Sequence, residues 1–149
     1  DILRVTSESP FPYLNNLDSA WLEHSKGNYN ASFLDNVIDG CGYEIINLKT
    51  LKSIKNKTSK FQNEHITNYI RLNKKKFSIK YISYPAFMNR KDIRLTVDNP
   101  EDLILCREVY KIIKNSVSHK KIISFLDKNE YLKKLVKKYL HKGYASMYL

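Results

Sequence analysis

The sequence predicts an α/β fold, because short alternating strands and amphipathic helices succeed one another along its 149 residues. Runs in which apolar and polar side chains alternate predict strands near residues 2–6, 43–46, 77–84 and 93–98. Between and after these runs, apolar residues recur every three or four positions, as in helices with one buried face. A chain of this length can form one domain around its own core. We therefore expect a mixed, mainly parallel sheet with helices packed against it.

Residues 92–113 contain the clearest transition from strand to helix. Ile93 to Val97 alternates apolar and polar side chains, and this strand is expected to stop at Asp98. Asn99 can cap the next helix, in which Pro100 suits the first position. Asp98 would then lie at the carboxyl end of a strand, where ligands bind in open α/β sheets. The alternative for Asp98 is a helix-cap acid; because Asn99 already provides a cap, we favour the ligand role.

The other helices follow from apolar periodicity and capping residues. They are expected over residues 12–27, 48–55 and 61–72, and Asn47 would cap the second of these. Two more are expected near the carboxyl terminus, one capped by Ser118 and a last one that ends near residue 140. A short strand is expected around 31–34. The predicted buried faces are Leu14, Leu17, Trp21 and Leu22 in the first helix, and Leu103, Cys106, Val109, Tyr110 and Ile113 in the helix after Pro100.

The net charge of +11 has two interpretations: an anionic partner, or solvated helix faces with no such partner. Lysines cluster in residues 49–60, 74–80 and 111–142, mostly between apolar helical positions. Such a charge could attract nucleic acid, an anionic membrane or a phosphorylated substrate. We favour solvated helix faces, because no signature of a nucleic-acid-binding module accompanies the charge.

The setting is expected to be reducing and cytoplasmic. Cys41 and Cys106 have no metal-ligand spacing and are too few for a disulfide scaffold. Within these residues there is no signal peptide and no apolar run near the roughly 18 residues that span a membrane.

Four segments carry a resemblance to a known family. Residues 94–103 read R-L-T-V-D-N-P-E-D-L, which resembles the R-L-T-V-D-x-P-E-D-L signature of the sugar cytidylyltransferases, in the branch with the spore-coat polysaccharide and acylneuraminate enzymes. Residues 4–10 are similar to that family's R-V-T-G-D-x-P, with Ser7 in place of glycine and Glu8 in place of an aspartate that binds magnesium. Glutamate keeps a carboxylate but moves its oxygens by one methylene. An exposed loop carboxylate is the alternative for Glu8.

Two further segments match less completely. Asp39, Gly40 and Glu44 agree with the family's D-G-L-D-V-E-V-F, whereas Gly42 replaces its second acid. Residues 64–71 resemble E-H-V-T-P-Y-I-R, and they retain its Glu, His and Arg as Glu64, His65 and Arg71, with Asn68 in place of proline. From the residues alone, a surface pair is the more ordinary interpretation of Glu64 and His65.

The resemblance implies a fold and an activity. The fold would be a three-layer nucleotidyltransferase sheet, Rossmann-like and glycosyltransferase-A-like, with helices on both faces; residues 1–149 would be the carboxyl-terminal part of one domain whose amino-terminal half is missing. The activity would be activation of a sugar or sugar acid for surface polysaccharide synthesis, in which CTP and the sugar give a CMP-sugar and pyrophosphate. Magnesium would be the cofactor and a homodimer is possible.

The resemblance also implies roles for particular residues. Asp98 and Glu8 would be the catalytic residues and the Mg²⁺ ligands, and the substrate-binding residues would be Arg94, Glu44, Asp39, Glu64, His65 and Arg71. None of the four glycines has the spacing of a phosphate-binding loop. We therefore expect no turnover by these residues alone. The alternatives are a non-catalytic relative that binds a sugar nucleotide or a partner, favoured by Ser7, Glu8 and Gly42, and a basic nucleic-acid-binding module.

Overall fold

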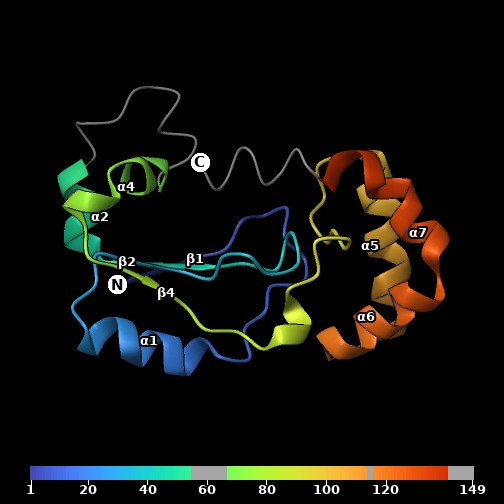
Figure 1. Ribbon diagram of the computed structural model, residues 1–149, viewed down its shortest axis with the longest axis horizontal. Coiled ribbons are helices and arrows are strands. Elements are labelled where there is room, and N and C mark those ends of the chain that lie inside the picture. Colours follow the sequence, from blue (N-terminus) through green and yellow to red (C-terminus); the bar gives the residue numbers. More distant parts are fainter. Residues whose placement is uncertain (55–66, 114–115, 141–149) are drawn as a thin grey trace.

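The computed structural model describes residues 1–54, 67–113 and 116–140, and its centre is a four-stranded sheet (Figure 1). The strands are β1 (Ile2–Arg4), β2 (Ala31–Phe33), β3 (Glu44–Ile46) and β4 (Ile79–Tyr81), in the order β1-β3-β2-β4. Strand β3 is antiparallel to both of its neighbours, whereas β2 and β4 are parallel. The expected mixed sheet is confirmed.

The expectation of a mainly parallel sheet is wrong. Only residues 34–43 separate β2 from β3, and they form a loop without a helix. Parallel neighbours need a crossover of a dozen or more residues, so a connection this short returns the chain in the opposite direction. The pairing of β2 with β4 is parallel because helical segments intervene between them.

Helices cover both faces of the sheet, as expected (Figure 1). One face packs against α2 (Leu48–Ile54) and α4 (Asn68–Leu72), and Phe33 shares a buried cluster there with Ile54 and Ile70. The opposite face carries α1 (Leu17–Lys26), whose buried His24 contacts the hydroxyl of Ser32 on β2 through Nδ1 at 2.8 Å. The expected cap of α2 is confirmed by Asn47, whose Oδ1 accepts hydrogen bonds from the N–H groups of residues 49 and 50.

The carboxyl-terminal helices pack beside the sheet (Figure 1). They are α5 (Pro100–Ile113), α6 (His119–Lys128) and α7 (Glu130–Val136), with single-turn 3₁₀ helices at η1 (Lys74–Lys76), η2 (Ala86–Met88) and η3 (Lys137–Tyr139). Ser118 caps α6 as expected, since its hydroxyl accepts from the N–H of Lys121. None of the helices that the structure describes is long and apolar enough to cross a lipid bilayer.

The expected strand at residues 93–98 is not formed. The backbone there is extended but has a single isolated bridge, between Arg94 and Asp39. Its other backbone partner is a turn, because the N–H of Val97 donates to the carbonyl of Glu8 at 2.9 Å. The alternating side chains thus match a buried extended segment, but the neighbours of this segment are loops and no ladder can develop. Strand β4 is likewise shorter than the expected 77–84.

Two helix faces differ from those expected, and a polar residue explains each difference. Helix α5 buries Asp102, Leu105, Cys106, Val109 and Ile113, whereas Leu103 and Tyr110 are 42% and 65% exposed. Helix α1 begins at Leu17, not at Pro12, and buries Ala20 and His24 while Trp21 and Leu22 are exposed. Both buried stripes follow helical spacing. Each buried stripe contains one polar residue, His24 in α1 and Asp102 in α5, and a search for apolar periodicity does not select such residues.

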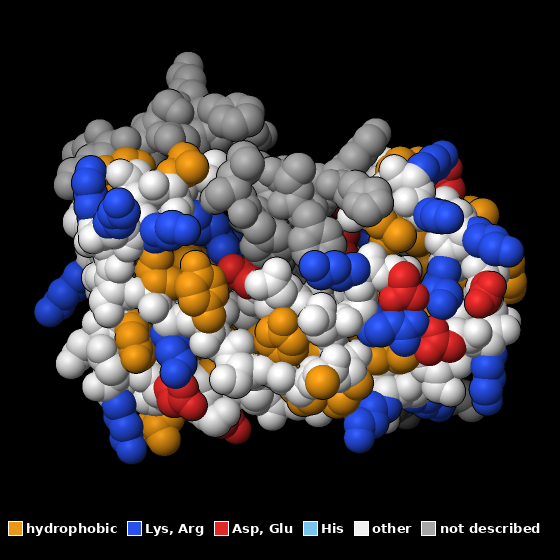
Figure 2. Space-filling model, viewed as in Figure 1, with side chains coloured by type: hydrophobic (Ala, Val, Ile, Leu, Met, Phe, Trp, Pro, Cys, Tyr) orange, Lys and Arg blue, Asp and Glu red, His pale blue; other side chains and the backbone are white. Residues whose placement is uncertain are grey.

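The surface charge is distributed over several elements. Figure 2 shows lysine and arginine side chains scattered across one face, with acidic side chains among them at the α6–α7 end. Four of the charged groups there form one network, in which Arg90 and Lys133 both pair with Asp92 and Asp127. This arrangement favours solvated helix faces, as inferred from the sequence.

Acidification should weaken the fold through His119. Its Nε2 lies 3.0 Å from the carbonyl of Phe11 and its ring packs edge-on against Tyr13. Burial lowers the pKa of His119 below its ordinary 6.5, despite that hydrogen bond. Because the unfolded chain then binds the proton more readily, the stabilisation is present above 6.5 and is lost as pH falls through the lower folded value. Denaturant unfolding between about pH 8 and about pH 5 should show this loss.

The matched variant is His119→Gln, whose amide can still donate to the carbonyl of Phe11. Its unfolding free energy should depend less on pH over the same interval. His24, whose pKa is also lowered by burial, supplies the remaining dependence. Equal pH dependence in the variant and the unmodified chain would contradict this assignment.

Candidate functional site

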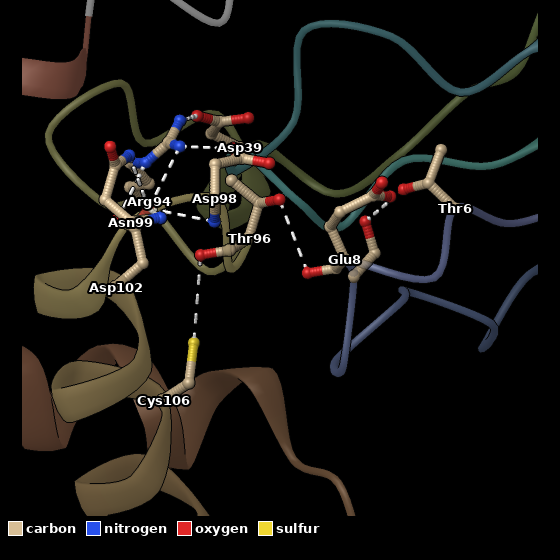
Figure 3. Close-up of polar contacts among 10 residues, drawn as sticks. Thr6, Glu8, Asp39, Arg94, Thr96, Asp98, Asn99, Asp102 and Cys106 are labelled. Carbon is tan, nitrogen blue, oxygen red and sulfur yellow. Dashed lines mark hydrogen bonds and ion pairs between the residues drawn. The ribbon is translucent and has the colours of Figure 1, made fainter. Parts of the chain in front are cut away.

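Three segments that carry sequence motifs meet at one end of the sheet, beside the start of α5 (Figure 3). They are the turn at residues 6–9, the turn at 39–40 and the extended segment 94–98. The N–H of Leu95 donates to the carbonyl of Asp39 at 2.7 Å, and the segment is bonded to Glu8 through Val97. The backbone itself therefore brings these motifs together.

Gly40 allows the turn at residues 39–40 to approach this segment. Its φ of +84° is a conformation that residues with a side chain rarely adopt. A Cβ at this position would lie 2.5 Å from the nitrogen of Thr96 and 2.6 Å from the carbonyl carbon of Leu95. Both atoms belong to the backbone and cannot rotate away, so the turn requires glycine.

The guanidinium of Arg94 is the centre of the site. Its Nη1 donates to Oδ2 of Asp39 at 2.6 Å and its Nη2 donates to Asp98. Its Nε and Nη2 also donate to the two carboxylate oxygens of Asp102, at 2.9 and 3.1 Å. Arg94 is only 4% exposed. Three carboxylates thus surround one buried cation, which favours a structural role for Arg94 over direct contact with a substrate.

Asp102 connects this cluster to helix α5. It is buried and accepts hydrogen bonds from the backbone N–H groups of Asp98 and Asn99, at 3.1 and 3.0 Å. Burial alone would raise the pKa of Asp102, but its hydrogen bonds from Arg94 and Asn99 outweigh this and hold the pKa below its ordinary value. Asn99 was expected to accept hydrogen bonds from the helix through its side chain. Instead, the side chain of Asp102, the third residue of α5, accepts from Asn99, as in one half of a capping box.

Asp39 lies in a different electrostatic environment. Burial raises its pKa, and the negative charges of Asp98 and Asp102 add to this effect, while the ion pair with Arg94 opposes it. The net direction is upward. The pKa values of the partly buried Asp39 and the buried Asp102 are therefore displaced in opposite directions.

Asp98 and Glu8 are the carboxylates of this site that reach solvent. The side chain of Asp98 is 48% exposed, and Glu8 is exposed at the tip of a turn closed by the hydrogen bond from the Ser9 N–H to the Thr6 carbonyl at 3.1 Å. Thr96 links the two regions, since its hydroxyl donates to the carbonyl of Glu8 (Figure 3). No described residue forms a hydrogen bond or ion pair with the Glu8 carboxylate.

The donor set suits magnesium better than a transition metal. In the part of the chain that is described, no three His, Cys, Asp or Glu side chains form a metal-binding group. Magnesium, however, prefers oxygen ligands and is commonly held by one or two carboxylates together with water and substrate phosphates. Asp98 and Glu8 both present exposed carboxylate oxygens, which are the type of ligand that magnesium takes.

A second polar cluster lies on the sheet face covered by α4. Arg71 donates to both oxygens of Asp35, at 2.6 and 3.0 Å, and to Oε1 of Glu44 at 2.8 Å. Arg4 donates to the other oxygen of Glu44 at 2.9 Å, and Arg71 lies over the ring of Phe33 at 3.8 Å. Glu44 and Arg71, which the sequence selected separately, are therefore partners.

The sequence-selected residues thus fall into two groups. Arg94, Asp39 and Asp98 belong to the first cluster, with Glu8 bonded to it through its backbone, and Glu44 and Arg71 belong to the second. Glu64 and His65 lie outside the described residues.

Three members of the clusters were not selected as site residues from the sequence. Arg4 and Asp102 were matched only as positions within the family motifs, and Asp35 was not singled out at all. Asp35 closely follows the end of β2, so the strand-end argument applied to Asp98 would have found it. Nothing local in the sequence distinguishes Asp102 from other first-turn acids.

Comparisons with known proteins add a fold assignment. No protein-family profile matches the sequence. The uncharacterized protein MJ1063 of Methanocaldococcus jannaschii is 32% identical over 148 residues, which are 98% of this chain and 61% of that protein. The structure of a cytidylyltransferase from Leptospira borgpetersenii serovar Hardjo-bovis superimposes with a TM-score of 0.74 at 24% identity, over 88% of this chain and 57% of that one.

The fold is therefore cytidylyltransferase-like, as the sequence led us to expect. The chain spans less than two thirds of the length of either protein.

Replacement of Gly40 tests the turn at residues 39–40. Gly40→Ala should lower the free energy of unfolding by about 2 kcal/mol or more, because the new Cβ meets fixed backbone atoms in a strained conformation. Gly27→Ala is the matched control: its φ of −81° is ordinary, and the three atoms nearest to its Cβ all belong to the side-chain ring of Tyr29 and not to the backbone. Denaturant titration measures both, and equal losses would contradict the argument.

Proposed function

We propose that this chain is the part of a cytidylyltransferase that holds a magnesium ion and a sugar or sugar acid. The reaction would join the cytidylyl group of CTP to a hydroxyl group of the sugar and release pyrophosphate. The main support is that three motifs resembling that family meet here: Asp39 and Asp98 both pair with the buried Arg94, and the Glu8 turn is bonded to the same extended segment through its carbonyl group. The cytidylyltransferase-like fold agrees with this proposal.

Asp98 and Glu8 are the residues that would hold Mg²⁺. When bound, the ion would supply positive charge that offsets the negative charge of the phosphates during nucleotidyl transfer. Neighbouring residues of the chain would hold Asp98 and Glu8 in place. Asp98 is fixed through its side chain and its N–H, and the Glu8 turn is fixed by its carbonyl group.

The second cluster is proposed as part of the sugar site. The carboxylates of Asp35 and Glu44 can accept hydrogen bonds from hydroxyl groups, and Arg71 and Arg4 can pair with an acidic group. Asp39, together with Glu64 and His65, would complete the substrate contacts according to the resemblance. A role in surface polysaccharide synthesis, a homodimer and a cytoplasmic setting belong to the same proposal.

A non-catalytic relative is the second candidate, and specific residues favour it. Ser7, Glu8 and Gly42 stand where the family pattern has a glycine and two aspartates. Each of the two acid positions is altered, so a protein of this kind could bind a sugar nucleotide or a partner without turnover.

Calorimetry with Mg²⁺ and CTP tests the metal assignment. The unmodified chain should bind Mg²⁺–CTP, and Asp98→Ala should abolish the part of the binding that depends on magnesium, because it removes the fixed carboxylate. Asp92→Ala is a matched control, since Asp92 is also 48% exposed and paired with an arginine. Equal magnesium-dependent binding by Asp98→Ala and the unmodified chain would reject the assignment.

Turnover should require more than these 149 residues. Their four glycines include no phosphate-binding loop, so we expect no CMP-sugar from CTP and a sugar acid. Anion-exchange chromatography of the reaction products would detect any CMP-sugar that forms. Formation of a CMP-sugar by this chain alone would contradict the expectation while supporting the enzyme class.

A further inference from the structure

We propose that Arg94 is a positioning residue that, with the buried Asp102, fixes the Asp98 carboxylate for a divalent cation. This inference rests on the proposed function, because it takes Asp98 as the metal ligand. It assigns to Arg94 a role other than the substrate contact suggested by the sequence motif.

The first step of the argument is that Arg94 is closed to ligands. Its Nε, Nη1 and Nη2 all donate to carboxylates of the chain, and its side chain is 4% exposed. A substrate could reach it only by displacing Asp39, Asp98 or Asp102. Its bonds to Asp39 and Asp102, which are themselves buried or nearly so, are shielded from solvent.

The second step is that Arg94 is held in one orientation. Asp102 binds it through two parallel hydrogen bonds, a geometry that fixes the plane of the guanidinium. Asp102 is held in turn by the N–H groups of Asp98 and Asn99 and by the amide of Asn99. The orientation of Arg94 is therefore set by the first turn of α5, the same turn that Asp98 precedes.

The third step concerns what remains free on Asp98. Arg94 donates to Oδ2 of Asp98, and the backbone N–H of Asp98 donates to Asp102. Asp98 is therefore held through both its side chain and its backbone. No described residue forms a hydrogen bond with Oδ1, and the side chain is 48% exposed. Arg94 thus occupies one oxygen of this half-exposed carboxylate and leaves the other available to a cation.

Charge and geometry make different predictions for Arg94. A positive charge next to a metal ligand repels a cation, so on charge alone Arg94 would weaken metal binding, and a lysine with the same charge would change nothing. Positioning requires two planar donors at fixed angles, which lysine does not have. The variant Arg94→Lys therefore separates the two roles.

The experiment follows Mn²⁺ binding by paramagnetic broadening of amide NMR signals in the unmodified chain and in variants. Asp98→Asn should lose the broadening around residues 6–9 and 98–99. Arg94→Lys should weaken Mn²⁺ binding about tenfold or more, as with other residues that orient metal ligands. Arg90→Lys is the matched control, because Arg90 also pairs with two aspartates, Asp92 and Asp127, and should retain full affinity.

Asp102→Asn provides a second route if Arg94→Lys does not fold. It keeps the shape of the side chain but weakens the two-point contact with Arg94, and Asp102 is too buried to touch a metal. Asp39→Asn likewise removes one negative charge beside the guanidinium of Arg94, so it measures the effect of charge alone. Positioning predicts a larger loss of Mn²⁺ affinity for Asp102→Asn than for Asp39→Asn, and equal losses would overturn it.

The outcomes separate this inference from the function on which it rests. Binding that is lost in Asp98→Asn but unchanged in Arg94→Lys would overturn the positioning role and leave the metal assignment intact. Absence of Mn²⁺ binding by the unmodified, folded chain would overturn the metal assignment and the positioning role together.

Discussion

The ion-pair cluster around Arg94 is the interaction on which the arrangement of this protein depends. A buried guanidinium is strongly unfavourable without partners, and here the partners come from the turn at residues 39–40, the end of the extended segment and the first turn of α5. Removing one partner of a buried pair costs about 3–5 kcal/mol, because a charge is left uncompensated. Asp102 meets this description, whereas the half-exposed Asp98 contributes far less. The fold and the candidate site therefore share their central contact.

Sequence reasoning predicted the elements better than their arrangement. The helices and their caps at Asn47 and Ser118 follow from local patterns, whereas helices on both faces were implied by the family resemblance. The strand directions did not, because the short loop between β2 and β3 determines them and was not considered. On the buried face of α5, Cys106, Val109 and Ile113 were predicted correctly. Asp102 was missed for a physical reason, because it is polar and is buried through its pairing with Arg94.

The candidate site was predicted as a set of residues but not as a set of contacts. Motifs selected Asp98, Arg94 and Asp39, yet Arg94 and Asp39 are 55 positions apart and no local pattern indicates that they bond. The second cluster shows the same limit, since Glu44 and Arg71 were selected separately and Asp35, which binds Arg71, was not selected. A strand-end argument could have selected Asp35, but nothing in the sequence pairs it with Arg71, which is 36 positions away.

The separation of these partners along the chain has a consequence for the order of folding. Thr96 and Glu8 are 88 positions apart, whereas the contacts within and between α5, α6 and α7 are much more local. Closing a long loop has an entropic cost that must be met before its contacts form, so local helical structure develops first. We expect the polar cluster to be among the last parts to assemble. In stopped-flow refolding, the proposed metal site should therefore form after most of the helical circular dichroism has appeared.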